Sequence, residues 1–221
     1  SASFGQPPLA CKTFCSRAGD GEKVRKGRDP CHEQFDNIIN IGASKIDETK
    51  FPKATNHQIE WSRLDLNTVN NICKELDSVD FMFFNQNQSS LSPGDFSSNI
   101  GQLEILKSIK SWTSGHWTSC QLPYVMIKTL EKKFTPEIKI GWMLSSFIDY
   151  QYEDVEKHPD YSGNKFTNYL IMKSFSNSFK CFGIDPYFDS SAIYDIIRDI
   201  CEGKINCEGQ VIDDFNHKAS I

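Results

Sequence analysis

Short, mostly apolar runs that end in polar residues are the feature that most constrains the fold of this chain. Ile38–Ile41, Val79–Phe84 and Ile138–Leu144 have the composition of strands that are buried on both faces of a sheet. Segments with apolar residues at three- and four-residue spacing, which is typical of amphipathic helices, lie between and after these runs. Strands and helices are therefore expected to alternate along the chain.

The remaining elements follow the same alternation. Further short strands are expected at Gln58–Trp61, which leads to Leu64-Asp65-Leu66, and at Phe182–Ile184 and Gln210–Ile212. Helices are expected at Leu9–Ala18, Thr68–Leu76, Trp117–Phe134, Lys165–Phe179 and Ala192–Cys201. The order predicts an α/β fold with a doubly wound, mostly parallel sheet and helices on both faces, of the Rossmann type. No linker divides the chain, so residues 1–221 are predicted to form one domain.

Composition excludes several classes of function. The chain has 24 Lys and Arg against 29 Asp and Glu, a net charge of −5, so it has no basic surplus for binding nucleic acid. No apolar run approaches the roughly 20 residues of a membrane-spanning helix, and no signal-peptide core follows the first residues. The sequence therefore predicts a cytoplasmic protein without a nucleic-acid or membrane partner.

The eight cysteines do not form a CxxC pair, which favours reduced, buried thiols over a disulfide framework. Cys11, Cys15, Cys31 and His32 are of the residue types that bind zinc, but the short ligand spacings of a zinc site are missing. No metal is expected.

A tyrosine and a lysine at helical spacing follow the expected strand Ile138–Leu144. In a doubly wound sheet, ligands bind beyond the carboxyl ends of the strands, where Ser145-Ser146 is followed by Tyr161 and Lys165. Residues four apart share a helix face, so the ammonium can lower the pKa of the phenol and let it act as an acid or base nearer neutral pH.

The YxxxK spacing by itself does not identify the reactive pair, because it also occurs at Tyr124/Lys128 and at Tyr169/Lys173. The first of these precedes the serine-bearing strand, and the second lies two turns further along the same expected helix as Tyr161. Only Tyr161 begins a helix after a strand, a serine pair and a loop, so the context selects Tyr161.

At these residues the chain resembles the short-chain dehydrogenase/reductase family, and other segments resemble that family's motifs in the same order. Ser1–Pro7 resembles the glycine-rich turn TGxxxGxG entered after its Thr, with Gly5 unchanged. Leu64-Asp65-Leu66 resembles the adenine-contacting Asp motif, and Asn85-Gln86-Asn87-Gln88 resembles the NNAG turn. Ile184-Asp185-Pro186-Tyr187 resembles the Pro-Gly turn, and Gly209–Asp213 resembles the family's last strand.

The resemblance implies a role for each catalytic position. Ser146 would hydrogen-bond the substrate carbonyl, Tyr161 would donate the proton, and Lys165 would hold the cofactor ribose and acidify the phenol. His116 stands where the family has an Asn in the helix before the serine strand. Its alternative interpretation is a histidine with a structural role only.

The same resemblance implies a nicotinamide cofactor. Its contacts would come from Ser1, Ser3 and Gly5 in the phosphate turn and from Asp65, Asn85, Lys165 and Pro186 elsewhere. Gly42-Ala43-Ser44-Lys45, after the second expected strand, contains no acid for a ribose 2′-hydroxyl, whereas Ser44 and Lys45 could contact a 2′-phosphate. This favours NADP(H) over NAD(H); the alternative interpretation is that Lys45 is a solvated loop charge.

A phosphate turn at Ser1–Pro7 has one structural requirement. The strand that leads into such a turn lies in the middle of the sheet, so this assignment predicts an additional strand before residue 1.

The sequence thus predicts an NADP(H)-dependent oxidoreductase that interconverts a carbonyl and an alcohol on a small organic substrate, and the resemblance adds the expectation of a homo-oligomer. The alternative is a binding or scaffold protein that keeps this fold without turnover. The altered glycine turn, the altered NNAG turn and His116 motivate that alternative.

Overall fold

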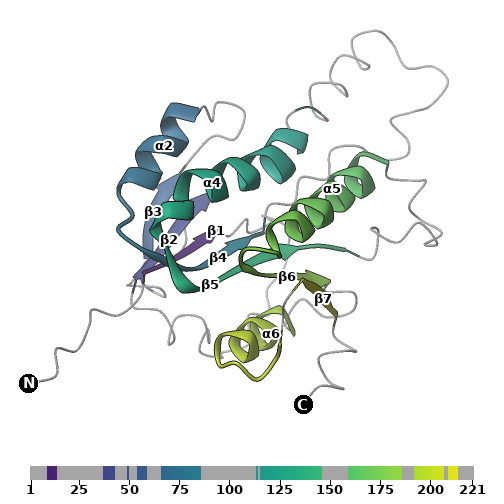
Figure 1. Cartoon of the computed structure of the whole chain (residues 1–221). Coiled ribbons are helices and arrows are strands. Elements are labelled where there is room, and N and C mark those ends of the chain that lie inside the picture. The colour runs from purple at the N-terminus through teal and green to yellow at the C-terminus, as the bar shows by residue number, and fades with distance from the viewer. Residues whose placement is uncertain are drawn as a thin grey trace, which may run out of the picture.

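The computed structural model of the chain describes residues 9–13, 37–42, 49, 54–58, 66–85, 113, 115–145, 159–185, 192–206 and 209–213. They form a seven-stranded parallel sheet in the order β3-β2-β1-β4-β5-β6-β7 (Figure 1). The strands are β1 Leu9–Thr13, β2 Asn37–Gly42, β3 Ala54–Gln58, β4 Val79–Phe84, β5 Phe134–Met143, β6 Lys180–Asp185 and β7 Gln210–Asp213. The helices are α2 Leu66–Lys74, η3 Trp117–Gln121, α4 Leu122–Leu130, η4 Glu131–Lys133, α5 Pro159–Phe175 and α6 Ala192–Cys201. The expected doubly wound α/β fold is confirmed.

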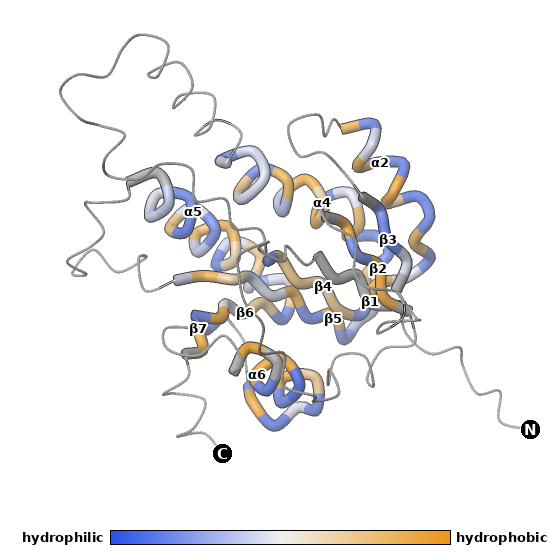
Figure 2. The backbone as a smooth tube through the Cα atoms, turned by 180° about the vertical axis from the view of Figure 1, so that it is seen from behind, coloured by the Kyte–Doolittle hydropathy of each residue, from blue (hydrophilic) through white to orange (hydrophobic). Residues whose placement is uncertain are grey.

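Helices cover both faces of the sheet. On one face α2, α4 and α5 pack on a core that includes Met82, Trp142 and Leu144, and on the other face α6 packs on Phe83 and Phe182 (Figure 1). Successive side chains of β4 and β5 alternate between the two cores, as the pleat of a strand requires. Figure 2 shows apolar and hydrophilic stretches alternating along α6, which is the pattern of a helix with one side packed on a sheet.

Strand β1 corrects two of the sequence predictions. Leu9–Thr13 is a strand, although a helix was expected over Leu9–Ala18. It pairs with β2 on one side, with Cys11 opposite Ile39, and with β4 on the other, with Cys11 opposite Met82. β1 therefore fills the central place for which a strand before residue 1 was expected, and the backbone groups of β2 and β4 are paired without such a strand.

Strand β3 lies earlier than predicted, at Ala54–Gln58 rather than Gln58–Trp61. It stands at the edge of the sheet and has no apolar run. The fully buried Asn40 of β2 donates a hydrogen bond from Nδ2 to Oδ1 of Asn56, 3.0 Å away. A polar pair across the strands thus replaces the apolar pattern by which buried strands are recognised.

The helix expected over Trp117–Phe134 is divided into three segments. η3 is a π-helix, α4 is an α-helix, and the 3-10 helix η4 leads into β5, which already begins at Phe134. Pro123 lies in the first turn of α4. Because proline has no N–H, it cannot continue the regular hydrogen-bond ladder from the preceding turn, and a change of helix type at this point follows.

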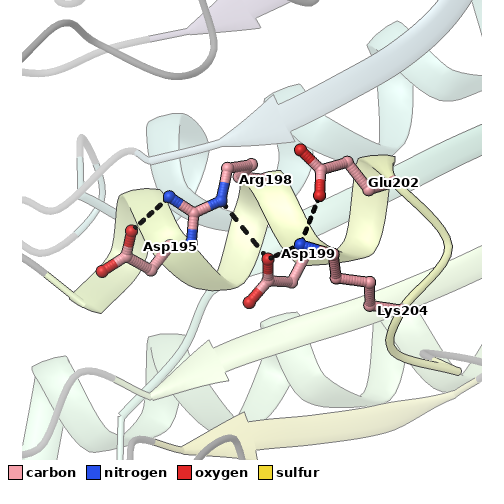
Figure 3. A network of polar contacts seen from close by, with 5 residues as sticks. All are labelled: Asp195, Arg198, Asp199, Glu202 and Lys204. Atoms are coloured by element: carbon pink, nitrogen blue, oxygen red, sulfur yellow. Dashed lines mark hydrogen bonds and ion pairs between the residues drawn. The ribbon is translucent and has the colours of Figure 1, made fainter. Parts of the chain in front are cut away.

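The end of α6 is closed by backbone and side-chain contacts. Gly203, with φ +74°, allows a Schellman motif in which the N–H of Lys204 bonds the carbonyl of Asp199 at 2.9 Å. The Asp199 carboxylate is 2% exposed and lies 3.3 Å from Arg198 Nε and 3.4 Å from Lys204 Nζ (Figure 3). Two cations therefore compensate a buried anion on this face of the sheet.

Within the part of the chain that the structure describes, no helix combines the length and apolar composition needed to cross a bilayer.

Two glycines give a matched test of the packing. A Cβ on Gly141 would lie 2.6 Å from Cδ2 of Phe83 and 2.6 Å from Cε2 of Phe182, whereas a Cβ on the exposed Gly163 of α5 would meet nothing within 4 Å. We expect Gly141→Ala to lower the free energy of unfolding by about 1–3 kcal/mol through overpacking. We expect Gly163→Ala to raise it by about 0.5–1 kcal/mol, because alanine favours helix over glycine. Urea denaturation measures both changes, and a Gly141→Ala variant as stable as the wild type would contradict the close approach of the two rings.

Candidate active site

Polar residues at the ends of three neighbouring strands lie at the carboxyl edge of the sheet. Asn85 follows β4, Ser145 follows β5, and Asp185 ends β6. Because all strands are parallel, these residues lie at one edge. The helices that return toward the amino edge begin here, so the starts of η3 and α5 lie beside the same polar residues.

Lys165 is the buried cation of this edge. It is 3% exposed, and its Nζ donates a hydrogen bond to the carbonyl oxygen of Met143 at 2.7 Å. Burial lowers the pKa of Lys165 from 10.5 to about 8, and nearby Cys120 and Asp185 oppose this shift. At pH 7 the amine therefore remains largely an ammonium, which ties α5 to the end of β5.

Tyr161 lies one helical turn before Lys165 and is half-buried. The Nζ of Lys165 is 5.5 Å from the centroid of the Tyr161 ring, a cation–π distance. The structure therefore brings together the tyrosine and lysine that sequence context selected.

The other two YxxxK lysines are engaged elsewhere. Lys128 forms an ion pair with Glu131, with Nζ 2.5 Å from Oε2, and Tyr124 is 48% exposed. Lys173 is exposed, and its Nζ donates to the carbonyl oxygen of Gly209 at 3.1 Å. Neither pair combines burial with a position at the start of a helix.

His116 lies immediately before η3 and contacts α5. Its Nδ1 is 3.0 Å from Oδ1 of Asn164, which is 4% exposed and precedes Lys165. The Cys120 thiol donates to the backbone oxygen of Asn164 at 3.4 Å and to its Oδ1 at 3.8 Å. Burial raises the pKa of Cys120 to about 12, against the lowering effect of Lys165, so this thiol stays protonated and acts as a donor.

The described residues include four of the predicted site residues, namely His116, Tyr161, Lys165 and Asn85. Ser146, Ser1, Ser3, Gly5, Ser44, Lys45, Asp65 and Pro186 lie outside the described residues. Ser146 follows directly on Ser145, and Pro186 directly on Asp185, so both come next in the chain after positions at the carboxyl edge.

The assignment of the glycine-rich turn requires a correction. Ser1, Ser3 and Gly5 precede β1, whereas the phosphate turn of this fold follows the first strand and so begins after Thr13. There the sequence has Cys15, Gly19 and Gly21 at the GxxxGxG spacing, with Cys in the first place. Because a helix is predicted over Leu9–Ala18, a glycine-rich turn after Thr13 is not predicted from the sequence. Residues 14–36 lie outside the described part of the chain.

Comparisons with known proteins identify the fold. No protein-family model matches the sequence, and no curated protein matches it. A short-chain dehydrogenase from Salmonella enterica serovar Typhi is similar in structure, with a TM-score of 0.67 and 10% identity over 93% of this chain and 96% of that one. A 3-oxoacyl-[acyl-carrier protein] reductase from Brucella melitensis has a TM-score of 0.65 and 13% identity over 96% of each chain.

A third similar structure contains a nucleotide. It is a protein from Burkholderia multivorans described as a short-chain dehydrogenase/reductase and solved with bound NADP, with a TM-score of 0.66 and 13% identity over 94% of this chain and 96% of that one. Together these structures show that the chain has the Rossmann-type fold of the short-chain dehydrogenases/reductases. The resemblance seen in the sequence is confirmed at the level of the fold.

The buried ammonium predicts a pH dependence of stability. Between about pH 8 and pH 10.5 the folded chain has lost the Lys165 proton while the unfolded chain keeps it, so the unfolded state binds more protons and the Lys165 contribution rises with pH. We expect the free energy of unfolding of the wild type, minus that of Lys165→Met, to increase across this window. Denaturant titrations at a series of pH values measure it. The corresponding difference in free energy of unfolding for Lys173→Met, which removes an exposed lysine from the same helix, should change less with pH. An equal change with pH for the two variants would contradict the burial of Lys165.

Proposed function

We propose that this protein is an NADP(H)-dependent oxidoreductase that interconverts a carbonyl and an alcohol on a small organic substrate. The observation that carries the proposal is the Tyr161–Lys165 pair, which lies at the carboxyl edge of the sheet with Nζ 5.5 Å from the phenol ring. The fold shared with short-chain dehydrogenases/reductases supports it.

The proposed mechanism assigns one task to each side chain. Tyr161 gives its hydroxyl proton to the carbonyl oxygen during reduction, and Ser146 donates a hydrogen bond to the same oxygen. The Lys165 ammonium stabilises the negative charge that develops on the phenol oxygen. The nicotinamide supplies or accepts the hydride when it is bound.

The donor set at the edge fits a nucleotide. An ammonium has three N–H donors, and among the described residues Lys165 donates one of them to the Met143 carbonyl; the others would serve the ribose hydroxyls. Asn85, which follows β4, would contact the cofactor from the neighbouring strand. Asp65 would contact the adenine, and Pro186 would contact the nicotinamide side.

The phosphates would be held by the segments that follow β1 and β2 in the sequence. The pyrophosphate would lie against the segment with Cys15, Gly19 and Gly21, because glycine lets a backbone approach a phosphate closely. Ser44 and Lys45 follow β2 and would bind the 2′-phosphate. The NADP in the Burkholderia multivorans structure supports the choice of cofactor.

Nucleotide binding tests the cofactor assignment. Lys45→Ala should weaken NADPH binding much more than NADH binding, because only NADPH carries the phosphate that the lysine pairs with. Thermal-shift titrations of wild type and variant with both nucleotides measure the difference. Equal losses for both would show that Lys45 does not discriminate, and absence of binding to either would overturn the cofactor proposal.

Turnover tests the catalytic pair. Tyr161→Phe removes the proton donor and keeps the ring, so kcat should fall by roughly 10²- to 10⁴-fold with little change in NADPH affinity. The assay follows NADPH oxidation with a panel of small aldehydes and ketones. The matched controls Tyr124→Phe and Tyr169→Phe should retain turnover, and loss of activity in either, with Tyr161→Phe active, would place the reaction elsewhere. NADPH binding without turnover on any substrate of the panel would favour a binding protein of the same fold.

A further inference from the structure

We propose that Asn164 is a positioning residue that fixes the tautomer of His116, keeping the hydrogen on Nδ1 and leaving Nε2 as the proton-accepting nitrogen. The tautomer follows from the contact alone, whereas its use in the reaction rests on the proposed function.

The direction of the hydrogen bond carries the inference. Nδ1 of His116 is 3.0 Å from Oδ1 of Asn164. An amide oxygen can only accept, so the ring nitrogen must be the donor and must carry the hydrogen. A neutral imidazole has one N–H, and Nε2 then holds the lone pair.

The Cys120 thiol also approaches the side chain of Asn164. Sγ approaches the same Oδ1 at 3.8 Å and the backbone oxygen of Asn164 at 3.4 Å. The single S–H of Cys120 can be shared between these two oxygens of Asn164, and Oδ1 faces both the thiol and the His116 ring. Since the thiol stays protonated, as described above, it acts as a donor under ordinary conditions.

The contact joins the two helices that carry the candidate site. His116 immediately precedes η3, Cys120 lies four residues later within η3, and Asn164 lies in α5 next to Lys165. At 4% exposure Asn164 is shielded from water, which would otherwise compete for its oxygen. His116 itself is only half-buried, and its partner Asn164 directly precedes the buried Lys165 in α5.

The fixed tautomer determines which nitrogen of His116 takes up and releases protons. An asparagine side chain, which the resemblance places at position 116, is neither an acid nor a base, whereas an imidazole nitrogen can accept and release a proton. With Nδ1 held by Asn164, the neutral ring takes up a proton on Nε2 and the imidazolium releases it from Nε2, while the Nδ1 hydrogen stays in place. His116 would thus exchange protons between solvent and the Tyr161–Lys165 pair through one defined nitrogen.

NMR of the imidazole nitrogens tests the tautomer without any assay of activity. The ¹⁵N spectrum is recorded at a pH at which the ring is neutral, and loss of one set of signals in His116→Gln assigns His116 among the five histidines. In the wild type we expect a protonated Nδ1 and an unprotonated Nε2. In Asn164→Leu the hydrogen should shift in part or wholly to Nε2, and in Asn164→Asp, which keeps an acceptor oxygen, it should stay on Nδ1.

The chain offers a matched control one helical turn further along. Asn168 is 3% exposed on the same helix, and its Oδ1 has no hydrogen-bond partner among the described residues. Asn168→Leu should therefore leave the His116 tautomer unchanged. A wild-type ring with its hydrogen on Nε2, or an unchanged ring in Asn164→Leu, would overturn the proposal. If Asn164→Leu does not fold, the wild-type and Asn164→Asp spectra still decide.

Kinetics separate this proposal from the proposed function. In an active preparation, Asn164→Leu should lower kcat by roughly 10- to 100-fold with NADPH affinity retained, and Asn164→Asp should recover part of the loss. Asn168→Leu should keep kcat within about twofold of the wild type. Full activity in an Asn164→Leu variant with a displaced tautomer would overturn the use of His116 in the reaction. If the wild type shows no turnover, the proposed function fails while the NMR result still decides the tautomer.

Discussion

The parallel pairing of all seven strands is the constraint on which the rest of the structure depends. Parallel neighbours cannot be joined by tight turns, so the chain must return across a face of the sheet between strands, and the described helices do so. This places the carboxyl ends of β4, β5 and β6 beside the starts of η3 and α5. Both faces are covered by helices, so the edge is where polar side chains from separate segments can meet. Asn85, Ser145 and Asp185 lie at this edge because of the topology, although they are far apart in sequence.

Helix α5 buries polar side chains at this edge, which is unfavourable in free energy. Asn164 and Lys165 are each no more than 4% exposed, so this helix buries an amide and an ammonium where a purely structural helix would bury apolar side chains. Burying such groups without partners is unfavourable by several kcal/mol for a charge, on the order of 1–3 kcal/mol for an amide. Lys165 is compensated by the Met143 carbonyl, and the oxygen of Asn164 by His116 and Cys120. A helix that keeps costly polar groups on its buried side is typical of a functional site rather than of a packing element.

The sequence predicts those parts of the fold whose signal is local. Val79–Phe84 and Ala192–Cys201 are found at the predicted residues, because a continuous apolar run and a strong 3.6-residue period are readable in one segment. Leu9–Thr13 is too short to show either period, and Ala54–Gln58 is stabilised by polar pairing with its neighbour, so both were misplaced. In the site, the four-residue spacing of a tyrosine and a lysine is local and could be found. The contact of Asn164 joins residues 48 apart in the chain, and no pattern in the sequence encodes it.

His116 and Asn164 together explain a departure from the resemblance that looks unfavourable when each residue is considered alone. A histidine in place of the expected asparagine removes an amide from the helix before the serine strand. The structure returns an amide to the same neighbourhood from α5, as the side chain of Asn164 bonded to the His116 ring. An amide bonded to an imidazole does what the amide alone cannot, since it orients a group that takes up and releases protons. The substitution therefore does not by itself indicate loss of function, because the partner that a functional histidine requires is present and buried.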